Sequence, residues 1–385
     1  MRKAATAALL LCIFLVAGCG DTFRPIVLPV VQSGGDPQSF SNAIILSNSG
    51  TANAGSTTHI NVSGDTNAGQ VSLGVNPVFA AVINGNRLFA ANAGESSLSS
   101  YTALLPTVAQ PSTITLPAGS APSYLYSNNP AILYVALSGL NTVGLVDLNL
   151  NLFGGQISVG TNPGAMVGTT SGSKLYVANK GDGTVSVITA ATNLVTSTII
   201  VGGSPVSLVA NADSSKVYVV NQTSNSVSVI DTAADTATNI AVGSSPSFAI
   251  YDPHLLRVYI ANSGSSTVSV INADPNAGTA FNTVLATVAV GATPNSVAPL
   301  ADGSRVYVAN SGSGTVSVIN ALNNTLLRTI TVGTTPVSLV ASSDSSKVFV
   351  ANRGSNTVSV IRTSDDTVTV NIPVPASPIL AIMTP

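Results

Sequence analysis

Short runs of alternating apolar and polar residues recur along most of the chain and predict β-strands. In the clearest example, residues 337–340, 347–352, 357–361 and 367–370 are rich in Val, Ile, Phe and Thr. Turn residues such as Asp344-Ser345-Ser346 separate these runs, which is typical of antiparallel strands. No segment shows sustained helical periodicity, and 33 Gly and 21 Pro residues would interrupt most helices. The pattern therefore predicts an all-β protein.

Three motifs repeat along the chain with a period of about 42 residues. The motif Gly-x-x-Pro has its proline at Pro77, Pro122, Pro163, Pro205, Pro246, Pro294 and Pro336, and in a copy at Pro378 the Gly is replaced by Pro375. A second motif, aromatic-Val-Ala-Asn, ends at Asn92, Asn179, Asn221, Asn262, Asn310 and Asn352, with a degenerate copy at Asn48 and Leu137 in the Asn position of another. The third, Thr/Ser-Val-Ser-Val-Ile, starts at Thr184, Ser226, Thr267, Thr315 and Thr357. Four short strands in each unit of this length predict the blade of a β-propeller, with strands a to d counted from the inside outward.

The ends of the repeat array predict how the ring closes. The first b-strand, residues 44–48, has no a-strand before it, and the last a-strand, residues 377–383, has no b-strand after it. Joining the two ends into one blade removes two unpaired strand edges. We therefore expect a single propeller of eight blades, closed by the C-terminal a-strand against the N-terminal strands b to d. Seven blades are the alternative, because residues 57–62 match the repeat weakly.

The repeats resemble those of the YVTN family of bacterial and archaeal β-propellers. The resemblance rests on residues 176–179, 218–221, 259–262 and 307–310 with the Thr-Val-Ser-Val-Ile segments that follow them, and it extends over nearly all of the chain from residue 42. It implies an extracytoplasmic or surface protein. Relatives of the fold include sugar lactonases.

The N-terminus carries the features of a bacterial lipoprotein signal. Met1-Arg2-Lys3 precedes an apolar run too short to span a bilayer, and the run ends in Val16-Ala17-Gly18-Cys19, which resembles a lipobox. We expect residues 1–18 to be a signal peptide, and residues 19–41 to be a lipidated Cys19 with a flexible tether. Residues 42–385 then form the propeller. An ordinary signal peptide that happens to contain a cysteine is the alternative.

Composition narrows the chemistry that the chain can support. Only 7 % of its 385 residues are charged, against about 25 % in a typical soluble domain, and the net charge is −2. Without a basic block, nucleic acid is not an expected partner. Two His and two Cys residues allow neither a three-His metal site within one chain nor a disulfide framework, so we expect no metal and no cofactor.

The most informative positions are those where the repeats disagree. The d-to-a and b-to-c turns share one face of a propeller, around the mouth of the channel, and ligand sites of such rings usually lie there. In the b-to-c turns, charged residues replace the usual small or polar ones at Glu95, Lys180, Asp182 and Arg353. We predict that these four residues contact a ligand or partner; surface charge that supports solubility is the alternative. Lys180 and Arg353 lie four repeats apart, so an eight-bladed ring would place them opposite each other, where they could hold an anionic ligand.

The residues that recur in every repeat are interpreted as structural. The motif Asn residues satisfy local backbone or turns, the Pro residues fix the entry to strand a, and the aromatic residues pack between blades. Six b-strands begin with a cation on the other face, which indicates edge protection or pairing with a turn Asp. These are Arg87, Lys174, Lys216, Arg257, Arg305 and Lys347.

These observations favour a binding function over catalysis. We expect a membrane-anchored, monomeric propeller of the cell envelope that acts as a scaffold for a protein, glycan or wall polymer. A hydrolase resembling the propeller lactonases is the alternative, although only Glu95 and Asp182 supply carboxylates on the mouth face. A quinone-dependent dehydrogenase is disfavoured because such propellers use Trp between blades and this chain has none.

Overall fold

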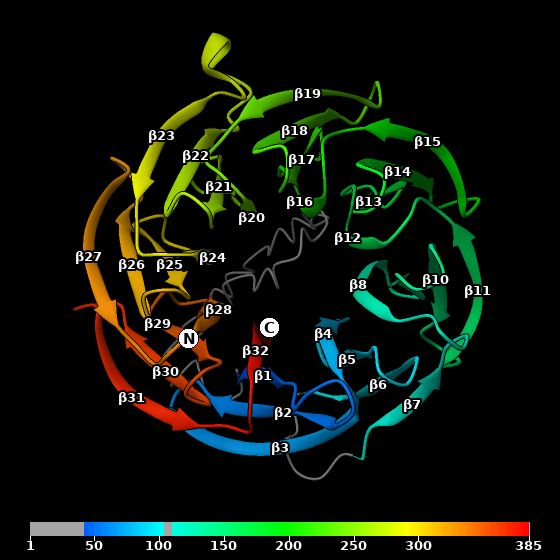
Figure 1. Cartoon of the computed structure of the whole chain (residues 1–385), viewed down its shortest axis with the longest axis horizontal. Helices are drawn as coiled ribbons and strands as arrows, with labels where there is room; N and C mark the ends of the chain where they lie inside the picture. Colours follow the sequence, from blue (N-terminus) through cyan, green and yellow to red (C-terminus); the bar gives the residue numbers. More distant parts are fainter. Residues whose placement is uncertain (1–41, 104–109, 385) are drawn as a thin grey trace, which may run out of the picture.

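The computed structural model describes residues 42–103 and 110–384. Within them, eight four-stranded antiparallel sheets stand as blades around a central axis (Figure 1). The expected eight-bladed β-propeller is confirmed, and the seven-bladed alternative is wrong. The predicted signal peptide, Cys19 and the tether lie outside the described residues.

The inner half of each blade consists of strands a and b. Strand a begins at the motif proline in every blade, because the fixed φ of Pro suits the entry to this strand and no hydrogen bond of the sheet is lost there. The a-strands are β4 (Pro77–Ile83), β8 (Pro122–Asn129), β12 (Pro163–Gly168), β16 (Pro205–Ala210), β20 (Pro246–Asp252), β24 (Pro294–Pro299), β28 (Pro336–Ala341) and β32 (Pro378–Met383). The b-strands are β1 (Asn42–Ser47), β5 (Arg87–Asn92), β9 (Ile132–Leu137), β13 (Lys174–Asn179), β17 (Lys216–Asn221), β21 (Arg257–Asn262), β25 (Arg305–Asn310) and β29 (Lys347–Asn352).

The outer half of each blade consists of strands c and d. The c-strands are β2 (Ala54–Asn61), β6 (Ser97–Thr102), β10 (Thr142–Asp147), β14 (Thr184–Thr189), β18 (Ser226–Asp231), β22 (Thr267–Asn272), β26 (Thr315–Asn320) and β30 (Thr357–Arg362). The d-strands are β3 (Thr66–Val75), β7 (Ser112–Thr115), β11 (Leu152–Ser158), β15 (Leu194–Ile200), β19 (Thr236–Ala241), β23 (Val284–Ala289), β27 (Thr325–Thr331) and β31 (Thr367–Pro373). A short 3₁₀ helix, η1 (Gly278–Ala280), lies in the insertion between β22 and β23.

The ring closes as the repeat offset predicts. β32 pairs antiparallel with β1, so that blade 1 consists of β32, β1, β2 and β3, and blades 2 to 8 follow in chain order from β4–β7 to β28–β31. Beyond β32, the N–H of Thr384 donates to the carbonyl of Asn42 at 2.9 Å, and the N–H of Asn42 donates to Oγ1 of Thr384 at 2.8 Å. The two ends of the described chain therefore lie together.

The register of blade 1 corrects one detail. The sequence placed the degenerate copy of the Asn motif at Asn48. In the structure, Ser47 pairs with Pro378 and Ser56, as Asn352 pairs with Pro336 and Thr357 in blade 8. Ser47 therefore holds the motif position, and the predicted position was wrong by one residue.

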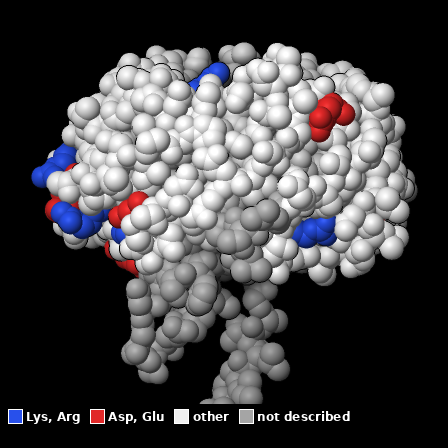
Figure 2. Space-filling view, turned by 90° about the horizontal axis from the view of Figure 1, so that it is seen from below, with Lys and Arg blue, Asp and Glu red and all other residues white. Residues whose placement is uncertain are grey.

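The core lies between the blades, where apolar side chains of facing sheets interlock. Between blades 8 and 1, for example, Phe349 and Val360 pack with Ile45 and Ile60. The b-strand aromatics are at most 1 % exposed, which confirms their predicted place in the core: Phe89, Tyr134, Tyr176, Tyr218, Tyr259, Tyr307 and Phe349. On the side of the ring that Figure 2 shows edge-on, most of the described surface is uncharged, and the charged side chains in view gather mainly at the left-hand end.

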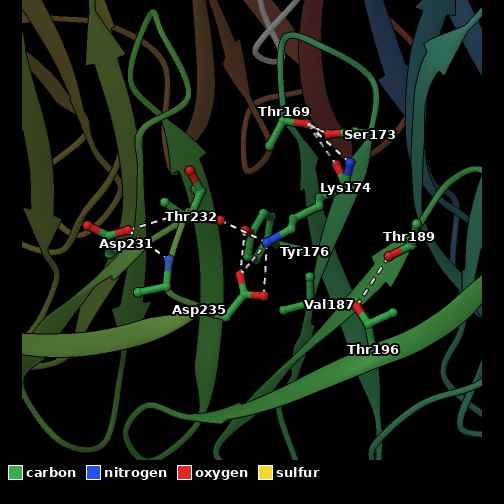
Figure 3. Close-up of polar contacts among 12 residues, drawn as sticks. Thr169, Ser173, Lys174, Tyr176, Val187, Thr189, Thr196, Asp231, Thr232 and Asp235 are labelled. Carbon is green, nitrogen blue, oxygen red and sulfur yellow. Dashed lines mark hydrogen bonds and ion pairs between the residues drawn. The ribbon is translucent and has the colours of Figure 1, made fainter.

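The cations that begin the b-strands join neighbouring blades. Lys174 of blade 4 reaches the c-to-d turn of blade 5, where its Nζ donates to the carbonyl of Thr232 at 2.8 Å and to both carboxylate oxygens of Asp235 at 2.9 Å (Figure 3). The hydroxyl of Tyr176 also donates to Asp235, at 3.0 Å. Burial, together with the negative charge of Asp235, raises the pKa of this tyrosine, so the hydroxyl stays protonated as a donor.

The same cross-blade cation contact recurs around the ring. In each case the cation binds a turn carbonyl and an Asp or Asn of the next blade; the pairs are Arg87 with Asn151, Arg257 with Asn324, Arg305 with Asp366, and Lys347 with Asp65. Lys216 instead pairs with Asp231 of its own blade. The predicted pairing with a turn Asp is thus present for four of the six cations, whereas Arg87 and Arg257 bind an Asn. The structure adds that the partner usually belongs to the next blade.

Blade 3 lacks this contact because Ile132 stands where six of the other b-strands begin with Lys or Arg. The Oδ1 atom of Asn193, which would face such a cation from blade 4, is buried and has no hydrogen-bond partner among the described residues. We expect Ile132→Arg to stabilise the protein by about 1 kcal/mol, since it supplies the missing donor. Urea unfolding measures the difference. Ile132→Met is the uncharged control, and an Arg variant no more stable than the Met variant would contradict the expectation.

Candidate functional site

The candidate site is the face formed by the b-to-c and d-to-a turns, called here the mouth face. In the six blades that have it, the motif Asn holds these turns together, because its Nδ2 donates to the hydroxyls five and seven residues later. Asn352, for example, donates to Thr357 at 3.2 Å and to Ser359 at 2.8 Å. All six Asn residues are fully buried. They belong to the scaffold, as the sequence indicated, and do not form a polar ring at the mouth, but their partners are Ser and Thr hydroxyls where backbone groups were expected from the sequence.

The glycine of Gly-x-x-Pro packs so closely against this Asn that no side chain fits there. A Cβ on Gly333 would lie 2.7 Å from Cγ of Asn352, closer than real Cβ contacts allow. Where the Asn is missing, the turn differs as well. Blade 3 has Leu137 at the Asn position and Gly119 with no atom near its would-be Cβ, and blade 1 has Ser47 with Pro375 in place of the Gly. The two motifs are therefore one structural unit.

Asp182 performs a task that serine performs in other blades. Its Oδ2 accepts from the backbone N–H of Thr161 at 2.6 Å. The Oγ atoms of Ser265 and Ser313 accept in the same way from the N–H groups of residues 244 and 292, both at 3.1 Å. The carboxylate of Asp182 therefore connects the d-to-a turn that leads into its blade with the b-to-c turn of the same blade.

Glu95 occupies the equivalent place in blade 2. Its Oε1 accepts from the hydroxyl of Ser97 at 2.7 Å, and a Cβ on Gly74 would fall 1.9 Å from this oxygen. Glu95 and Asp182 are both exposed, and the carboxylate of each accepts a hydrogen bond that stabilises the turns. These contacts give both residues a structural role in the turns, and their contact with a ligand stays a prediction.

Lys180 and Arg353 differ from every other cation of the described chain. Ten of the 13 Lys and Arg residues lie in the described part. Eight of these ten donate to a carbonyl, a carboxylate or another side-chain oxygen; the eight are Arg87, Lys174, Lys216, Arg257, Arg305, Arg328, Lys347 and Arg362. Lys180 and Arg353 are exposed, and neither side chain has a hydrogen-bond or ion-pair partner among the described residues.

The blade order places these two cations as the repeat count predicts. Lys180 follows β13 in blade 4 and Arg353 follows β29 in blade 8, so they stand on opposite sides of an eight-bladed ring. Arg353 also lines a pocket of about 230 Å³ where blade 8 meets blade 1, together with Asn48, Ser49, Gly50, Thr51, Asn76, Ser377 and Ile379. The repeat pattern did not predict this pocket, because the extra length of the first b-to-c turn becomes apparent only when the register of blade 1 is known.

A buried polar cluster lies between blades 1 and 2, where the other repeats carry apolar residues. Nε2 of His59 is 2.8 Å from the hydroxyl of Tyr101, which is also 2.5 Å from Oγ1 of Thr57. His59 is completely buried, and its Nδ1 has no hydrogen-bond partner among the described residues. Burial lowers the pKa of His59 to about 4. The cluster lies within the wall of the ring and does not belong to the mouth face.

The described part of the chain has few residues that could act together as metal ligands. In residues 42–103 and 110–384, no three His, Cys, Asp or Glu side chains gather closely enough to hold a metal ion. Nor does any helix among these residues have the length and apolar character needed to cross a membrane.

Comparison with known proteins supports the fold alone. No family model and no curated protein matches the chain. Similar solved structures include apo AztD from Citrobacter koseri, with 10 % identity, a TM-score of 0.67, and coverage of 90 % of this chain and 98 % of that one. Dihydro-heme d1 dehydrogenase NirN has 13 % identity, a TM-score of 0.69, and coverage of 92 % and 78 %. Kuenenia stuttgartiensis hydrazine synthase has 20 % identity, a TM-score of 0.60, and coverage of 75 % and 96 %.

Proposed function

We propose that this β-propeller is a lipid-anchored protein of the cell envelope that binds a protein, glycan or envelope polymer at its mouth face. The observation that carries the proposal is the distribution of cations. Away from the mouth, the described cations are held by contacts within the ring, whereas Lys180 and Arg353 on the mouth face have no partner among residues 42–103 and 110–384. Charges without a structural task on the face where turns from all blades converge are typical of a binding surface.

The direction of the chain supports an orientation for this anchored form. Asn42, where the description begins, lies with Thr384 on the face opposite the mouth, because β1 runs from that face toward the mouth. A tether over residues 19–41 would therefore join the ring on the side away from the mouth. Held in this way, the mouth face points away from the membrane and is open to large ligands.

The anchor itself is tested by Cys19→Ser. Several acyl chains on Cys19 would give lasting attachment, so we expect the wild-type protein in the membrane fraction and the variant in the soluble fraction. Immunoblotting of fractionated cells measures the partition. A variant that still sediments with membranes after a high-salt wash would contradict the assignment.

The binding function is tested by recovering envelope components on the immobilised mature protein. We expect a small set of components that is retained through washing and competed by excess free propeller. The alternative, a hydrolase resembling the sugar lactonases, predicts turnover of lactones by the same preparation. Lactone hydrolysis without any retained component would favour the enzyme over the scaffold.

A further inference from the structure

We propose that the pocket between blades 8 and 1 binds an oxyanion, either a carboxylate or a phosphate group carried by the ligand of the mouth face. This inference rests on the proposed binding function. It adds that Arg353 makes the charged contact with the ligand. An extended acidic polymer would place one such group in the pocket while the rest of it lies across the mouth face.

The pocket exists because the b-to-c turn of blade 1 is longer than its counterparts. In blade 8, four residues separate the paired positions Asn352 and Thr357, whereas eight separate Ser47 and Ser56 in blade 1. Insertions into single repeats usually map to the binding face of a repeat protein. Here the insertion builds the pocket wall from residues 48–51, directly beside Arg353.

The enlarged turn is held firmly despite its length. Nδ2 of Asn48 donates to Oδ1 of Asn76 at 2.7 Å and to the carbonyl of Pro77 at 2.9 Å, while Oδ1 of Asn48 accepts from the N–H of Gly50 at 2.9 Å. The N–H of Asn48 donates to the carbonyl of Ser377. One asparagine thus ties the turn to blade 2 and to the entry of β32. A wall fixed in this way loses little entropy when a ligand binds.

The lining of the pocket matches an oxyanion in charge and in donors. Arg353 is the charged residue of the lining, and no described carboxylate pairs with it. A guanidinium can bind a carboxylate or phosphate through two parallel hydrogen bonds. The backbone N–H groups of Ser49 and Thr51 have no acceptor among the described residues, so donors stand unpaired at the same turn.

The size of the pocket indicates that it holds one chemical group of the ligand and does not enclose the whole ligand. Its volume of about 230 Å³ is below the range of about 300–1,000 Å³ that is usual for pockets enclosing drug-sized molecules. A phosphate or the carboxylate end of one sugar fits this space. The remainder of the ligand must then lie outside, on the exposed turns of the mouth face.

The test is calorimetric titration of the full mature protein with inorganic phosphate and, separately, with glucuronate, at low ionic strength. We expect saturable binding of at least one probe, and Arg353→Ser to weaken it by about tenfold or more, since a charge-assisted bidentate contact is lost. Serine stands at the same position in blades 6 and 7, as Ser263 and Ser311, so the variant keeps a residue that the fold accepts.

Two variants separate a specific contact from a general effect of charge. Arg362→Ser removes the same charge on the opposite face and should leave the affinity unchanged. Arg353→Lys keeps the positive charge but lacks the planar guanidinium that can form two parallel hydrogen bonds. This variant should bind the probe with intermediate affinity. Binding of phosphate alone would indicate a phosphorylated polymer, and binding of glucuronate alone an acidic glycan.

The proposal is overturned if neither probe binds, or if Arg353→Ser and Arg362→Ser bind as the wild type does. In that case, recovery of envelope components decides separately whether the mouth face binds a ligand at all. Components that the Arg353→Ser variant still retains from envelope extract would leave the scaffold in place and remove only the oxyanion pocket.

Discussion

Truncation of the chain after Pro375 is expected to abolish cooperative unfolding of the propeller. The cut removes β32, which supplies strand a of blade 1 and pairs with β1 along its length. It also removes Ala381 and Met383 from the core between blades 8 and 1. A buried side chain of the size of methionine contributes about 1.5–3 kcal/mol, and the cut leaves β1 as an unpaired inner edge. The total loss is comparable to the stability of about 5–15 kcal/mol that holds a typical native protein together.

Circular dichroism during heating measures this effect. We expect the truncated protein to lose its sharp transition, while a control that lacks only Pro385 unfolds as the full chain does. A truncated protein that keeps one cooperative transition near the original temperature would show that strand exchange between the chain ends does not close the ring.

Acid is expected to destabilise the protein between pH 7 and pH 4.5 through His59. The pKa of this buried ring is about 4 in the folded protein and about 6.5 in the unfolded chain. The unfolded state therefore takes up the proton first, and the stability that is present above pH 6.5 is lost as the pH falls toward 4. The difference in pKa corresponds to a loss of about 3 kcal/mol over this range. Tyr101, the hydrogen-bond partner of the ring, stays neutral because burial raises its pKa.

The control for this prediction is His59→Val, because the other c-strands carry residues such as Val360 at this position. Urea unfolding at several pH values should show a much shallower pH dependence for the variant than for the wild type. The carboxylates of Asp213, Asp231 and Asp344 do not explain a slope in this window, since their lowered pKa values make their contributions to stability fall only at lower pH. Equal slopes for both proteins would contradict the role of His59.

The fold could be predicted from the sequence because every repeat carries the same information. Eight Pro residues mark the a-strands, and the offset between the first b-strand and the last a-strand determines the closure. The position of the first motif was missed by one residue because Ser47 and Asn48 are both acceptable at a strand end, and only pairing with β32 distinguishes them. Strand register within a degenerate repeat is a property of the assembled ring.

The candidate site could be predicted only in part. Comparing repeats singled out Lys180 and Arg353, which the structure shows exposed and without a partner among the described residues, and their contact with a ligand stays a prediction. The same comparison also selected Glu95 and Asp182, whose hydrogen bonds to Ser97 and Thr161 replace those of serine. The cross-blade cation contacts were not visible, because a period along the chain does not say which blade a long side chain reaches. The pocket beside Arg353 depends on an insertion that becomes clear only with the correct register.

The role of the mouth face as the binding face is tested most directly with two double variants of the immobilised protein. Lys180→Ser with Arg353→Ser removes the two mouth-face cations that have no partner in the described part of the chain. Arg328→Ser with Arg362→Ser removes two paired cations away from the mouth. Quantified recovery of envelope components should fall by about tenfold or more for the first double variant and stay at the wild-type level for the second. Equal recovery by the wild type and both variants would contradict a binding function for the mouth-face cations.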